Sequence, residues 1–214
     1  MAPDATVVSG VDHLVFATPD LETTASDLET RLGVPATPGG RHPGRGTSNV
    51  LFALGPRSYL EVIGPDPGQP APAAPRWFGI DALTGPRLVT WAASTAGLDE
   101  LVAGAARRGV RLGAVVDRSR VRPDGKWLRW RLTDPGTVIA DGVVPFFIDW
   151  GNEPHPAETL PPGLAFAGLT AEHPDAPAVR RILAVLGLAL VVVDGPQPAL
   201  IAKLEGPRGR IELR

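Results

Sequence analysis

Two strand-like segments of this chain each carry one glutamate in a similar apolar setting: Glu61 lies within residues 58–63 and Glu212 within residues 209–213. A Gly-Pro-Arg turn precedes each segment, and both the turns and the glutamates are 151 residues apart, which indicates an internal repeat. A carboxylate in a strand that otherwise reads as buried is costly unless it is paired or bound to a cation. Glu61 and Glu212 are therefore candidate catalytic residues.

The segments that must position these glutamates follow one order three times: a strand, then a helix, then further strands. In the first repeat, a strand at residues 11–17 leads to a helix at 21–32, and strands follow at 49–54 and 58–63. Proline-rich stretches separate the repeats. The sequence predicts an α+β protein of three βαβββ modules at residues 10–66, 85–151 and 164–214, joined by linkers at 67–84 and 152–163.

Composition limits the class of protein. The 214 residues are 43% hydrophobic, enough for a real core, and a formal charge of -2 without a basic stripe argues against a nucleic-acid partner. There is no cysteine, so any metal would be held by histidine and carboxylate groups. The N-terminus lacks a secretory signal, and the longest apolar stretch, 182–193, is too short to span a bilayer. We expect a cytoplasmic protein with small-molecule partners and no membrane partner.

A βαβββ unit that opens with Asp12-His13 and carries Glu61 on its last strand resembles the vicinal oxygen chelate superfamily. Within that superfamily, the glycine-rich stretch 39–49 and the segment 122–132 resemble glyoxalase-like domain proteins. The resemblance implies paired units whose mixed sheets curl around a cleft, as in glyoxalase and bleomycin-resistance proteins. It also implies a divalent metal in the cleft that chelates neighbouring substrate oxygens.

The resemblance implies metal ligands on the first and last strands of a unit. His13 and Glu61 match these positions in the first unit, and Glu212 matches the last-strand position in the third. In the middle unit the matching residues are Val89 and Ile148, which cannot bind a metal, although a shift of one residue would present Asp149 in place of Ile148. The pairing of units therefore decides the site. Units one and three would supply His13, Glu61 and Glu212, whereas units one and two leave two ligands.

These ligand types suit Zn, Mn, Ni or Fe(II), with open positions for water and substrate. Such a metal polarises a carbonyl or stabilises an enediolate, and Glu61 or Glu212 would double as general base. The leading interpretation is a metal-dependent isomerase or lyase that acts on a small oxygenated metabolite. The alternative is a metal-free protein of the same fold that binds or sequesters a small molecule.

Two groups of residues are candidates for substrate binding. In the glycine-rich loop at 39–47, two basic side chains and the backbone N–H groups suit a carboxylate or phosphate, and an asparagine follows on the next strand. Tryptophans fall on predicted strands of the middle unit, where they would line the cleft or pack in the core. Strand alternation puts Arg129 and Arg131 on one face and Trp130 on the other. The candidates are His42, Arg45, Asn49, Trp91, Arg129, Trp130 and Arg131.

Two further expectations concern a turn and a partner. A Pro-Asp-Gly sequence at 123–125 predicts the turn of a hairpin. An odd number of units leaves one sheet face unpaired, so a second copy of the chain is a candidate partner in a homodimer. In a third interpretation, the repeated glutamate is a relic of duplication and the chain mainly associates with itself.

Overall fold

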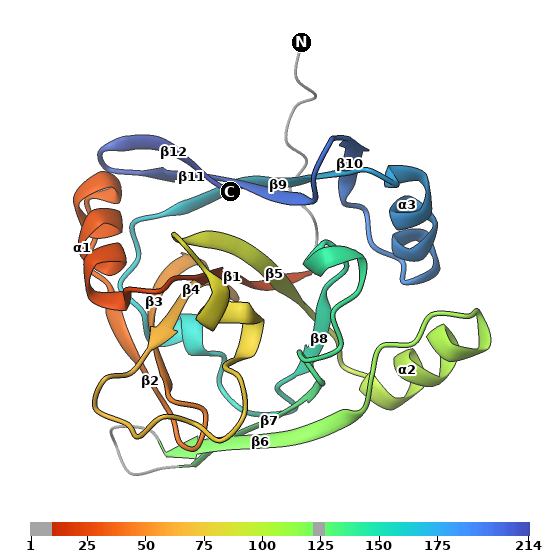
Figure 1. Cartoon of the computed structure of the whole chain (residues 1–214), viewed down its shortest axis with the longest axis horizontal. Helices are drawn as coiled ribbons and strands as arrows, with labels where there is room; N and C mark the ends of the chain where they lie inside the picture. Colours follow the sequence, from red (N-terminus) through yellow and green to blue (C-terminus); the bar gives the residue numbers. More distant parts are fainter. Residues whose placement is uncertain (1–9, 122–126) are drawn as a thin grey trace.

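A computed structural model describes residues 10–121 and 127–214, so the predicted turn at 123–125 lies outside the described residues. The order strand, helix, three strands occurs three times, and the strands form one mixed sheet of eight strands and one of four. In Figure 1 the larger sheet curls into a half-barrel below the smaller one. The predicted α+β class with repeated modules and curled mixed sheets is confirmed.

The first unit contains β1 (Val11–Ala17), α1 (Leu21–Leu32), β2 (Thr37–His42), β3 (Thr47–Gly55) and β4 (Ser58–Pro65). The second contains β5 (Arg87–Ser94), α2 (Leu98–Arg107), β6 (Val115–Val121), β7 (Trp127–Thr133) and β8 (Phe146–Asp149). The third contains β9 (Ala165–His173), α3 (Ala176–Val185), β10 (Val191–Asp194), β11 (Ala199–Gly206) and β12 (Gly209–Leu213). Short 3-10 turns are η1 (Trp77–Ala82), η2 (Ala140–Gly142) and η3 (Pro156–Thr159).

Local sequence explains the bounds of α1, which match the predicted helix at 21–32. The side chain of Asp20 accepts a hydrogen bond from the backbone N–H of Thr23 and caps the first turn. Gly33 ends the helix in the left-handed region, at φ 77°, and its N–H donates to the carbonyl of Glu29. By contrast, residues 39–42 of the predicted glycine-rich loop belong to β2, and only 43–46 form the turn to β3.

The first two units share the eight-stranded sheet, whose order is β2-β3-β4-β1-β5-β8-β7-β6. In each unit the first and last strands pair in parallel, β1 with β4 and β5 with β8. The two first strands, β1 and β5, pair antiparallel and join the units. This pairing brings the first and second units together at the centre of the sheet.

The third unit forms the separate four-stranded sheet with the order β10-β9-β11-β12. Its last strand, β12, pairs only with β11 and lies at the sheet edge, whereas β4 lies between β3 and β1. The third unit therefore repeats the element order of the first but not its strand order.

The main core lies between the two sheets and the three helices. Leu14 and Phe16 of β1 face this core with apolar residues from α1, α2 and α3. Val15 and Ala17 point to the opposite, concave face of the larger sheet, where Ile80 of η1 packs on them.

The two segments predicted as linkers contain turns that pack on the larger sheet. One is η1, and the other is η3, whose Ala157 packs on β3 and β4. Within the described residues, no helix is long and apolar enough to cross a membrane.

Candidate functional site

The concave face of the larger sheet brings His13 and Glu61 together. They lie on the neighbouring parallel strands β1 and β4, where His13 pairs with Tyr59 and Val15 pairs with Glu61. His13 Nε2 is 3.8 Å from Glu61 Oε2, and the two side chains are only 5% and 12% exposed. This distance is too long for a hydrogen bond. A basic nitrogen and a carboxylate therefore face each other in a nearly dry environment.

A β-bulge places Asp12 beside His13. Val11 pairs with Ala93 and His13 with Ala92, so Asp12 is an extra residue without a partner on β5. Bulges re-aim side chains. Here the carboxylate of Asp12 reaches the ring of its own neighbour, and its Oδ1 lies 2.7 Å from Nδ1 of His13.

Asp12 is fully buried and collects hydrogen bonds from the second unit and the segment after it. Its Oδ2 accepts from Ser94 Oγ at 3.3 Å, Trp150 Nε1 at 2.9 Å and His155 Nε2 at 3.2 Å. Burial raises the pKa of the Asp12 carboxyl, but hydrogen bonds from His13 and His155 outweigh this effect and hold the pKa well below its usual range. The site therefore contains a buried anion that its neighbours stabilise.

Glu61 is held by β3. Asn49 Nδ2 donates to Glu61 Oε1 at 2.5 Å, which fixes one carboxylate oxygen and leaves Oε2 facing His13. Asn49 Oδ1 is buried and has no hydrogen-bond partner among the described residues. The amide must keep this orientation, because a reversed amide would place its oxygen against the carboxylate.

A continuous series of aromatic rings crosses the concave face through the His13 site. On one side, the ring centroid of Phe146 lies 5.5 Å from that of His13 and 6.5 Å from that of Phe78 in η1. On the other side, Tyr59 stacks on His13 at 4.7 Å and lies 5.6 Å from His155. The series continues to Trp150 at 5.7 Å from His155, and then to Trp130 at 5.4 Å.

The second unit contributes an apolar surface beside the His13–Glu61 pair. Strand pairing places Ala92 opposite His13, and Ile148 stands two residues after Phe146 as Glu61 stands two residues after Tyr59. Val89, which matches His13 in the sequence, packs against Val15, Ala17 and Ile63 on the concave face. Ala92 and Ile148 pack in an apolar cluster with Leu128, Leu132 and Trp150. Among the described residues, no group of three or more His, Asp or Glu side chains is placed to hold a metal.

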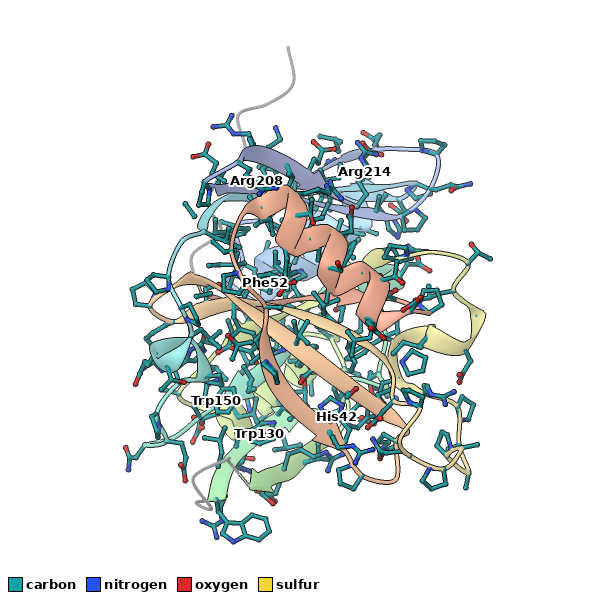
Figure 2. All side chains as sticks on the ribbon, turned by 90° about the vertical axis from the view of Figure 1, so that its left-hand side faces the viewer. His42, Phe52, Trp130, Trp150, Arg208 and Arg214 are labelled. Carbon is teal, nitrogen blue, oxygen red and sulfur yellow. The ribbon has the colours of Figure 1, made fainter. Side chains whose placement is uncertain are left out.

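Trp130 and Trp150 lie side by side at the end of the molecule away from the smaller sheet, as Figure 2 shows. They line a cavity of about 440 Å³ together with residues of β6, β7 and the segment after β8. Trp150 thus contacts the cavity through its ring and Asp12 through its N–H.

The other predicted substrate-binding residues lie away from His13. His42 packs against Trp77 of η1 at 5.6 Å, and Arg45 lies over the same indole ring at 4.7 Å. Arg131 lines the cavity but pairs with Asp99 of α2 at 2.8 Å, on the face opposite Trp130. Arg129 also lines the cavity, and it lies on the same face of β7 as Arg131, next to the ring of Trp127.

Trp91 and Glu212 are not brought to this site. Trp91 is completely buried in the main core on the helix side of the sheet, where its Nε1 donates to the carbonyl of Val143. Glu212 lies on β12 of the smaller sheet, exposed and 3.0 Å from Arg214. In Figure 2, Arg214 is at the opposite end of the molecule from Trp150. The prediction that all three ligands come together is therefore wrong: only His13 and Glu61 lie close to each other, because units one and two share a sheet.

Sequence reasoning missed Asp12, Trp150 and His155 as members of this site. Asp12 was visible only as part of the Asp-His motif, and alternation along a regular strand would have turned it away from His13. His155 lies in a proline-rich segment that resembles a plain linker. Asp12 joins the buried hydrogen-bond network because of the bulge in β1, and His155 joins it because η3 folds back onto the sheet.

The chain is similar to one protein family in sequence and to several solved structures in fold. The sequence profile of a family described as "Glyoxalase-like domain" matches residues 11–187. No curated protein matches the chain. A hypothetical protein from Staphylococcus aureus has a similar structure, with a TM-score of 0.65 at 11% identity over 97% of this chain and 99% of that one.

Two more distant structures are methylmalonyl-CoA epimerases, each with 20% identity and a TM-score of 0.45. The enzyme from Mycobacterium tuberculosis aligns over 70% of this chain and 91% of its own. A Streptomyces coelicolor variant in complex with 2-nitronate-propionyl-CoA aligns over 68% of this chain and 97% of its own.

Proposed function

The chain belongs to the glyoxalase-like domain family, and from this premise we propose that it is an isomerase- or lyase-type enzyme acting on a small oxygenated metabolite at His13 and Glu61. One observation carries the proposal. A histidine nitrogen faces a glutamate oxygen at 3.8 Å, both are nearly buried, and no hydrogen bond joins them. Such a pair suits a shared cation and a substrate oxygen better than it suits a structural contact.

His13 and Glu61 fit a divalent cation as two of its ligands. Two ligand atoms that each lie about 2.1 Å from a metal are roughly 3 to 4 Å apart, which includes the observed 3.8 Å. Metal-binding histidines usually donate their other ring N–H to a carboxylate, as His13 can to Asp12. With Ala92 and Ile148 opposite, the other positions fall to water and to neighbouring oxygens of the substrate. Bound Zn, Mn, Ni or Fe(II) would supply Lewis-acid polarisation of a carbonyl.

The chain itself supplies proton transfer and a dry site. Asn49 holds one oxygen of Glu61, so the other is oriented to accept a proton from a carbon next to a carbonyl. Tyr59 and Phe146 pack against the His13 ring and limit the access of water. Glu61 is thus the proposed general base, and His13 is the proposed anchor for the cation or the substrate oxygen.

Calorimetric titration with Zn²⁺ and Mn²⁺ tests the cation site. We expect one ion per chain, and we expect His13→Ala and Glu61→Ala each to weaken binding by at least about 100-fold, because each removes one of two ligands. Glu212→Ala is the matched control and should bind like the wild type. Equal binding by wild type and His13→Ala, or no binding at millimolar metal, would remove the cation from the proposal.

Solvent-deuterium exchange tests the proton transfer. NMR would follow incorporation of deuterium at the carbon next to the carbonyl in a panel of small 2-oxo acids, starting with pyruvate and phenylpyruvate. We expect exchange with the wild type and loss of exchange with Glu61→Gln. Exchange that persists in Glu61→Gln would show that Glu61 is not the base.

A second candidate function is a metal-free binding protein, and the apolar half of the concave face favours it. Ala92, Leu128 and Ile148 form an apolar cluster there, and the Trp130–Trp150 cavity opens beside them. This candidate predicts that phenylpyruvate raises the melting temperature in the presence of a chelator. Trp130→Ala should then weaken binding more than Glu61→Ala does. Trp127→Ala, on the opposite face of β7, is the control; if it weakens binding as much as Trp130→Ala, this candidate is wrong.

A further inference from the structure

We infer that Asp12 is the positioning residue of this site: it fixes His13 as the tautomer that carries its proton on Nδ1, so that the Nε2 lone pair faces Glu61. The inference deepens the proposed function and rests on it for the importance of that lone pair. It rests on four hydrogen bonds that converge on one buried carboxylate.

The donors leave little freedom in where the protons lie. The indole N–H of Trp150 can only donate, so Asp12 Oδ2 must accept. His155 Nδ1 accepts the backbone N–H of Ala157 at 3.1 Å, so a neutral His155 carries its proton on Nε2 and donates to the same oxygen. Asp12 Oδ2 therefore acts as an acceptor from both rings.

The other oxygen of Asp12 determines the state of His13. Oδ1 lies 2.7 Å from His13 Nδ1, and a carboxylate oxygen there requires a donor on the ring. A neutral His13 consequently has its proton on Nδ1 and a lone pair on Nε2. That lone pair points toward Glu61 Oε2 at 3.8 Å, where a cation or a substrate hydrogen would fit and a second lone pair does not.

This arrangement also makes the first unit's histidine depend on the second unit. The donors to Oδ2 come from the end of β5, the residue after β8 and the cap of η3. Asp12 reaches them only because the bulge at β1 turns it to the side of His13. The tautomer of His13 is thus set by the docking of the two units.

The substitution Asp12→Asn should reverse the tautomer. Trp150 and His155 both donate, so the amide oxygen of the new side chain must face them and its NH₂ group must face His13 Nδ1. Nδ1 of His13 then accepts a hydrogen bond from this NH₂ group, and the ring proton moves to Nε2, which faces Glu61. The lone pair that the proposed function needs is lost while the shape of the side chain is kept.

The test is ¹⁵N NMR of the imidazole nitrogens in the full chain without metal or ligand. The protein has four histidines, and His13→Gln assigns the resonances of interest. We expect a protonated Nδ1 and an unprotonated Nε2 in the wild type, and the reverse in Asp12→Asn. Ser94→Ala is the matched control, because it removes a donor to Asp12 that does not touch Trp150 or the imidazoles, and its His13 should resemble the wild type.

A wild-type His13 with its proton on Nε2 would overturn the inference, and so would an Asp12→Asn variant with the wild-type pattern. If Asp12→Asn does not fold, the wild-type and Ser94→Ala spectra still decide. In zinc titration, Asp12→Asn should lose roughly 10- to 100-fold in affinity. The expected tautomers without any zinc binding would defeat the cation proposal but leave this inference standing.

Discussion

The first and third units present the same motif in two different surroundings. Both have a Gly-Pro-Arg turn followed by a strand with one glutamate. Glu61 lies on an inner strand beside β1, where it faces His13 and is held by Asn49. Glu212 lies on an edge strand of the other sheet, exposed beside Arg214.

The difference shows that a glutamate in a strand becomes part of a candidate site only through its neighbours. Water solvates Glu212, so the charge needs no buried partner, and its contact with Arg214 contributes little to stability. Glu61 is shielded by β1 and β3, and its charge requires the specific groups that surround it. Strand order, and not the repeated sequence, separates the two environments.

The largest expected effect comes from removing the buried carboxylate of the first unit. Asp12→Ala leaves the buried donors of Trp150 and His155 unpaired, which should lower the free energy of unfolding by about 3 to 5 kcal/mol. Glu212→Ala, at the exposed third-unit site, should change it by less than about 0.5 kcal/mol. Urea denaturation of both variants measures the difference. Similar losses for both would show that the two environments are not distinct.

The next largest effect is expected in acid denaturation, which acts on Asp12 of the first unit. The pKa of folded Asp12 is below its unfolded value of about 3.9, so at acidic pH the folded protein binds fewer protons than the unfolded chain does. The stability from this group is complete above about pH 5 and is lost as the pH falls toward the folded-state pKa. Urea unfolding between pH 7 and low pH should show a steeper loss in wild type than in Asp12→Asn. Parallel curves would contradict the prediction.

The smallest expected effect compares the repeated turns themselves. A methyl group at Gly206 would meet the carbonyl oxygen of Leu32 and, at 2.9 Å, Cδ2 of Leu164, whereas one at Gly55 would meet nothing within 4 Å. Gly206→Ala should therefore destabilise by about 1 to 3 kcal/mol, and Gly55→Ala should stay within about 0.5 kcal/mol. Differential scanning calorimetry of both variants tests this. Equal melting temperatures would mean that the third-unit turn is not tightly packed against α1.

Several parts of the fold were predictable because they depend on local chemistry. The capping residue Asp20 and the terminating Gly33 define α1 from sequence neighbours alone. The three repeats and the positions of His13 and Glu61 also follow from short motifs. The bulge at Asp12 has no such local signal, because it arises where β1 must fit against β5.

The sequence by itself determined the units, their helices and the kinds of side chain that each strand carries. Only the tertiary structure decided that units one and two share a sheet, that β12 stays at an edge, and that His155 folds back to reach Asp12. The physical reason is that helix caps and strand patterns involve residues close along the chain. Strand order and buried hydrogen bonds depend on the packing of segments far apart along the chain, such as β1 with β5 and Asp12 with Trp150 and His155.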